Sequence, residues 1–77
     1  MKYSTEQMIA HISSIIDRQQ ENLEDLLSVK PKPISQLEKA KARIVELRSF
    51  RYDLSLGKIH NKNLYESVAK DMKEIGW

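Results

Sequence analysis

Residues 23–40 read LEDLLSVKPKPISQLEKA, and the two prolines in this stretch decide the fold. Apolar side chains recur every three or four residues on both sides of Pro31 and Pro33, which is the spacing of one helical face. When the chain is folded back at these prolines, the two stripes pair in a constant register, as Ile16 does with Leu47. The paired positions are 26 with 37, 23 with 40, 19 with 44, 16 with 47, 12 with 51 and 9 with 54. This register predicts an antiparallel helical hairpin.

Two polar residues interrupt the predicted seam between these helices. Gln19 falls opposite Ile44, and Arg51 falls opposite Ile12. Either both side chains lie at the edge of the seam and reach water, or they fix the register or the oligomeric state at some cost in stability.

Three capping signals mark where helices are expected to begin. A serine or asparagine cap is often followed three residues later by Glu or Gln, which completes a capping box. This spacing occurs in Ser4–Gln7, Ser35–Glu38 and Asn63–Glu66. Gly57 and Gly76 provide stops, because glycine tolerates the left-handed conformation at a helix C-terminus. We expect one all-α domain over residues 1–77, with helices over about 4–29, 35–56 and 64–75.

The third helix is too short to persist alone, so it must dock on another surface. Its docking residues are expected to be Leu64, Val68, Met72 and Ile75, with Trp77 as a lid. The hairpin seam leaves other apolar side chains unused: Met8, Ile15, Leu27, Val45, Phe50, Tyr52, Leu56 and Ile59. Because a chain of this size buries only a marginal core, we expect a dimeric helical bundle to cover them. A monomer in which the third helix covers them is the alternative.

Composition argues against several classes of protein. The chain has no cysteine, so it forms no disulfide or thiolate metal site, and His11 and His60 have no partner at metal-ligand spacing. No nucleophile elbow or phosphate loop is present, so we expect neither an enzyme nor a cofactor. The polar start at residues 1–4 is not that of a signal peptide, and no apolar run reaches the roughly 20 residues of a bilayer span. A cytoplasmic protein without membrane contact is expected.

The net charge of +2 conceals an uneven distribution along the chain. Residues 1–30 hold three Lys or Arg and five Asp or Glu, whereas residues 31–62 hold eight and three. Either the acidic first helix and the basic second helix complement each other along the hairpin, or the basic segment binds an anionic surface.

The second helix and the connection after it carry the expected partner-binding residues, because Arg and aromatic residues are enriched at binding hot spots. These residues are Arg48, Phe50, Arg51, Tyr52, Ile59 and His60. We expect a small protein–protein interaction module, an adaptor or inhibitor, with a protein partner and with self-association as a dimer. The predicted shape is similar to that of small helical-hairpin proteins of phages and mobile elements, an analogy of architecture only. A nucleic-acid-binding regulator that uses the basic helix is the alternative.

Overall fold

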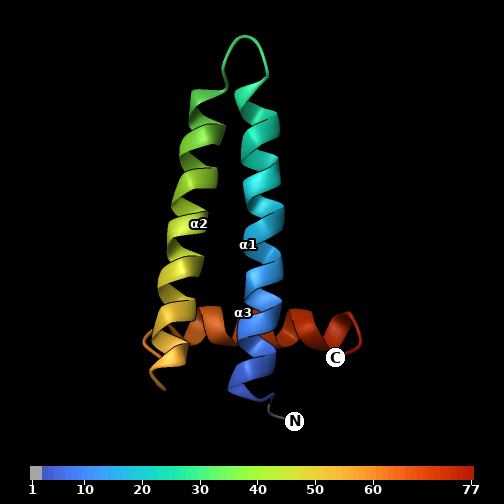
Figure 1. Ribbon diagram of the computed structural model, residues 1–77, viewed down its shortest axis with the longest axis vertical. Coiled ribbons are helices and arrows are strands. Elements are labelled where there is room, and N and C mark those ends of the chain that lie inside the picture. The colour runs from blue at the N-terminus through green and yellow to red at the C-terminus, as the bar shows by residue number, and fades with distance from the viewer. Residues whose placement is uncertain (1–2) are drawn as a thin grey trace.

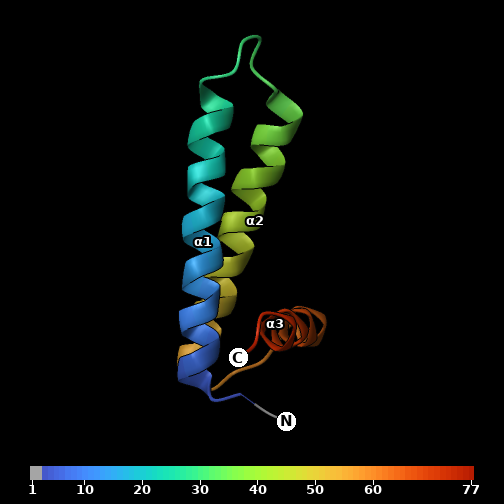
Figure 2. The same ribbon diagram turned by 90° about the vertical axis from the view of Figure 1, so that its right-hand side faces the viewer.

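The computed structural model describes residues 3–77 and contains three helices, α1 (Thr5–Leu27), α2 (Ile34–Ser55) and α3 (Lys62–Glu74). α1 packs antiparallel on α2, and α3 runs across one end of this hairpin (Figure 1). The turned view places α3 on one side of the hairpin only (Figure 2). The predicted all-α class is confirmed, and residues 3–77 contain no strand. The opposite side of the hairpin is left without a third layer.

The register between α1 and α2 agrees with the predicted one to within a single residue. The guanidinium of Arg51 donates a hydrogen bond of 3.1 Å to the hydroxyl of Ser13, the neighbour of its predicted partner Ile12. Ile16 and Leu47 belong to the same buried cluster, with 3% and 0% exposure. Arg51 therefore lies half-buried at the edge of the seam, where it bonds to a side chain of the other helix.

The start of α1 forms as predicted, whereas the start of α2 does not. The Ser4 hydroxyl accepts from the Gln7 amide at 3.1 Å, and the Gln7 side chain accepts from the Ser4 amide at 2.9 Å, so the capping box is confirmed. α2 begins one residue before the predicted cap Ser35, with Pro33 as its N-cap and no side-chain cap. Proline has no amide hydrogen, so Pro33 adds no unpaired donor at the start of the helix.

α3 also begins earlier than the capping pattern predicts. The cap is Asn61 and not Asn63, and its side-chain oxygen accepts from the Leu64 amide at 3.0 Å. Either asparagine can cap a helix by its chemistry. The buried Leu64 lies three residues after Asn61, so the earlier start places this apolar side chain inside the first turn, where it packs on the hairpin.

The end of α3 sends its last two large apolar side chains, Ile75 and Trp77, in different directions, although both are exposed. Gly76 has φ of +94°, and the amide of Trp77 bonds to the carbonyl of Met72 at 3.0 Å, which completes a Schellman turn. The Tyr3 hydroxyl donates to the Trp77 carbonyl at 3.4 Å. Ile75 is 60% exposed, so its predicted docking is wrong. The turn directs Trp77 back toward α1, whereas the cap position of Ile75 points outward.

The core lies where α3 crosses the hairpin. Its members come from all three helices and are Met8, Ile12, Ile16, Leu47, Phe50, Leu54, Leu64, Val68 and Met72. Nearer the tip of the hairpin only two helices meet, and Leu23 and Leu26 there are only half-buried. The third helix therefore completes the core at one end and leaves the other end as a two-helix layer.

Candidate interaction surface

Three of the predicted partner-binding residues come together on the side of the hairpin away from α3. Arg48, Arg51 and Tyr52 line one shallow depression of about 390 Å³, together with Ile9 and Ser55. No residue of α3 contributes to this depression. Tyr52 is 65% exposed, so its ring is available for contact with another molecule.

Phe50 does not belong to this surface, which corrects the predicted set. It is only 4% exposed and is part of the core. Residues two apart on a helix do not share a face, so Phe50 and Tyr52 point in different directions. α3 covers Phe50, which lies beside Leu64 and Asn61 at the junction with that helix.

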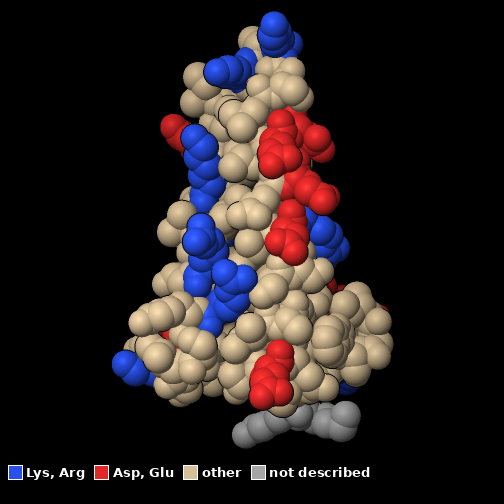
Figure 3. Space-filling model, in the orientation of Figure 1, with Lys and Arg blue, Asp and Glu red and all other residues tan. Residues whose placement is uncertain are grey.

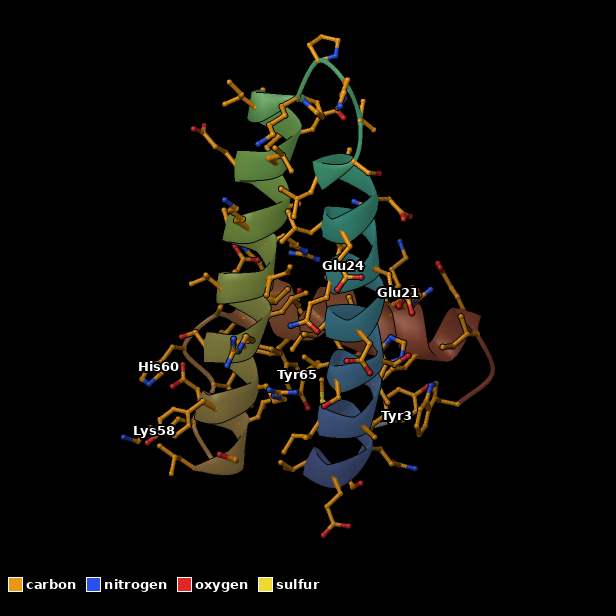
Figure 4. All side chains as sticks on the ribbon, turned by 45° about the horizontal axis from the view of Figure 1, so that its top comes forward. Tyr3, Glu21, Glu24, Lys58, His60 and Tyr65 are labelled. Carbon is orange, nitrogen blue, oxygen red and sulfur yellow. The ribbon has the colours of Figure 1, made fainter. Side chains whose placement is uncertain are left out.

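Ile59 and His60 lie in the connection between α2 and α3 and are both exposed. Figure 4 shows His60 and Lys58 pointing outward beside the C-terminal end of α2, away from α1. Ile59 is 46% exposed. These residues therefore extend the exposed surface beyond the end of the helix, but they do not line the depression that contains Tyr52.

An exposed apolar stripe runs along α2 and onto this connection. We name it the α2 stripe; its members are Val45 (67% exposed), Tyr52 (65%), Leu56 (52%) and Ile59 (46%). The first three are spaced by seven and four residues, so they share one face of the helix. Arg48 lies three residues after Val45 and four before Tyr52, and so borders the same face. A grouped set of exposed apolar side chains is typical of an interaction site.

Opposite charges form two separate columns on the side of the hairpin away from α3. Figure 3 shows Lys and Arg side chains over α2 and Asp and Glu side chains over α1. Within residues 3–77 no ion pair joins α1 to α2; Arg43 pairs with Glu46 on α2 itself, and the His11 ring contacts Asp71 of α3. The predicted complementarity of the two helices is therefore not realised as ion pairs along the hairpin.

A half-buried polar link joins α1 to α3, and the sequence analysis does not predict it. His11 is 3% exposed, and its Nε2 lies 2.7 Å from a carboxylate oxygen of Asp71. The edge of its ring faces Trp77, with centroids 6.1 Å apart and planes at 77°. Helical spacing in the sequence could have indicated this contact, because His11 lies on the same face of α1 as Met8 and Ile15, the face on which α3 packs. The link joins α1 to α3 beside the apolar core.

A further cavity lies in the corner between the hairpin and α3. It measures about 530 Å³, is open to solvent, and is bordered by side chains of both charges, including Arg18, Arg43, Lys70 and Glu74. Within residues 3–77 no three His, Cys, Asp or Glu side chains are placed to hold a metal ion.

Comparison with known proteins found no matching protein-family model, no matching curated protein and no matching solved structure. Among the described residues, no helix has both the length and the apolar content that a membrane crossing requires. A functional assignment must therefore be based on the exposed surfaces of the hairpin.

Proposed function

We propose that this protein is a non-enzymatic protein–protein interaction module, an adaptor or inhibitor, that binds another protein through the α2 stripe. The observation that supports this is the line of four large apolar side chains, 46–67% exposed, beside Arg48. Small phage and mobile-element hairpin proteins offer an analogy of architecture for such a role. A cytoplasmic location is part of the same proposal.

The chemistry of the stripe favours a protein partner. Burying an aliphatic or aromatic side chain contributes roughly 1.5–3 kcal/mol, so three or four such residues can drive binding. Tyr and Arg are the residue types most often found at hot spots, and Tyr52 lies four residues from Arg48. Both are on a helix whose opposite side is part of the core, so the binding face is already ordered before a partner arrives.

Nucleic-acid binding is the second candidate, and one observation favours it. Arg48 and Arg51 share a depression, and Lys41 lies seven residues before Arg48 on the same face of α2. Phosphate groups bind such clusters of cations. The acidic column on α1 lies beside these cations, however, and would repel a phosphate backbone (Figure 3). This candidate is therefore the weaker one.

Site-specific photo-cross-linking in the source cells tests the proposal. A photoreactive residue replaces Tyr52 in one variant and Ile75, which is 60% exposed on the other side of the molecule, in the matched control. We expect a discrete adduct with a protein from position 52 that resists nuclease and is absent from position 75. The same adducts from both positions, or none from position 52, would refute the α2 stripe as the binding site.

The nucleic-acid candidate is tested by titrating random duplex and single-stranded DNA and RNA at two salt concentrations. A phosphate-binding protein loses affinity steeply as salt rises. We expect no sub-micromolar binding at either concentration. Tight binding that collapses with salt, together with a nuclease-sensitive adduct at position 52, would replace the protein partner with a nucleic acid.

A further inference from the structure

The side of the hairpin away from α3 carries complementary charges that the chain itself leaves without ion pairs. On α1 these are Asp17, Glu21 and Glu24, which are spaced by four and three residues and are all exposed. On α2 they are Lys41 and Arg48, seven residues apart and also exposed. Figure 4 shows Glu24 on the side of α1 that faces away from α3, with Glu21 beside it. We name this set the charged face.

The register of the hairpin determines which charges lie at the same height along its axis. The hydrogen bond from Arg51 to Ser13 anchors the two helices to each other. Counting back along α2 from that bond puts Lys41 level with the segment between Glu21 and Glu24. The same count puts Arg48 within one helical turn of Asp17. The acidic and basic columns therefore match in height, side by side on one face.

We propose that the charged face is a homodimer interface, with the two-fold axis parallel to the long axis of the hairpin. Rotation about this axis lays α1 of one copy over α2 of the second copy at the same height. Lys41 of the second copy then meets Glu21 and Glu24, and Arg48 of the second copy meets Asp17. The symmetry repeats these contacts on the other pair of helices, which makes a parallel four-helix bundle with both tips at one end.

Charge excludes the other simple way of pairing these faces. A two-fold axis across the hairpin would lay α2 on α2 and α1 on α1, so that like charges oppose each other. Exposed apolar side chains near the tip agree with the parallel arrangement. Leu27 (48% exposed) lies three residues after Glu24, and Ile34 (66% exposed) lies seven before Lys41. In the parallel dimer, Leu27 of one copy meets Ile34 of the other.

A pair of charge-reversed chains tests the contacts between copies. One chain carries K41E and R48E, and the other carries D17K, E21K and E24K. Each chain alone opposes like charges in the proposed dimer, so its self-association should weaken at least about tenfold in sedimentation equilibrium. An equimolar mixture should restore association, because each acidic face then meets a basic one. Equal association of all chains, or a mixture no stronger than its components, would overturn the interface.

Misfolding of a variant does not obscure this test. Circular dichroism checks the helix content of each chain, and a chain carrying all five substitutions keeps both columns complementary with their signs exchanged. That chain should associate as the parent does. A photoreactive residue at Leu56, on the α2 stripe, separates this inference from the proposed function, because its cross-links to another protein should persist in the chain that carries D17K, E21K and E24K, which leaves Arg48 and the stripe unchanged.

The orientation of the dimer is tested with one spin label at the tip. The chain has no cysteine, so K32C provides a single attachment site in the connection between α1 and α2. In the parallel dimer the two labels lie across the width of the bundle, roughly 20–30 Å apart for helices packed 8–10 Å apart and flexible labels. In an antiparallel dimer they are separated by about the length of the molecule, 45 Å. The longer distance, or no dipolar coupling, overturns the parallel arrangement.

Discussion

Replacing Leu47 with alanine should remove a large part of the free energy of unfolding. Leu47 is 0% exposed and belongs to the cluster that joins α1, α2 and α3. Val45 is on the same helix but is 67% exposed, so Val45→Ala is the matched control. The pair tests whether the predicted seam, and not the helix itself, stabilises the fold.

The expected magnitude follows from the burial. Leu→Ala removes three carbon groups, which at about 0.8 kcal/mol each lose about 2.4 kcal/mol of transfer free energy. The cavity that remains raises the total to about 3–5 kcal/mol. A domain of this size is stable by only about 4–12 kcal/mol. Leu47→Ala should therefore remove between about a quarter and all of this free energy of unfolding, whereas Val45→Ala should lower it by under about 0.5 kcal/mol.

Urea titration followed by circular dichroism and by Trp77 fluorescence measures these differences. Trp77 is the only tryptophan and lies against His11, so its emission reports the docking of α3. Ile16→Ala in the same background adds a double-mutant cycle, and neighbours in one cluster should couple by about 0.5–3 kcal/mol. A loss below about 1 kcal/mol for Leu47→Ala, or equal losses for positions 45 and 47, would show that the seam lies elsewhere.

Three further perturbations test the other features of the fold. His11→Ala should lower the free energy of unfolding by about 1–2 kcal/mol, because it removes the hydrogen-bond partner of Asp71. In a urea titration the Trp77 emission should then change at a lower urea concentration than the helical circular-dichroism signal does. Unchanged emission would show that the link does not hold α3. Gly57→Ala should lower the free energy of unfolding by about 1–2 kcal/mol, because φ at this position is +75°, a left-handed conformation that strains any residue with a Cβ. The added Cβ itself would meet no atom within 4 Å, so backbone strain is the only expected cost. An unchanged melting temperature would contradict this strain. Deleting residues 63–77 should lower the melting temperature and raise binding of an apolar dye, because Met8 and Phe50 lose their cover, and an unchanged melting curve would show that α3 is dispensable.

The sequence by itself determined the features that depend on local chemistry and on helical period. The mirrored stripes around Pro31 and Pro33 specify two helices and their register, because facing apolar side chains must meet at one height, and the Arg51–Ser13 bond agrees. The capping box at Ser4 also formed as predicted, because both of its bonds lie within four residues. Such features need no knowledge of distant parts of the chain.

Only the tertiary structure decided which of the remaining apolar side chains are covered. α3 crosses one end of the hairpin, so it buries Met8 and Phe50 and leaves Val45 and Tyr52 in solvent. The same crossing brings Asp71 to His11, sixty residues away in sequence. A helical period gives the direction of each side chain around its own axis, but the angle at which a third helix docks depends on packing among all three helices. The division between core and exposed surface on α2 therefore could not be read from α2 alone.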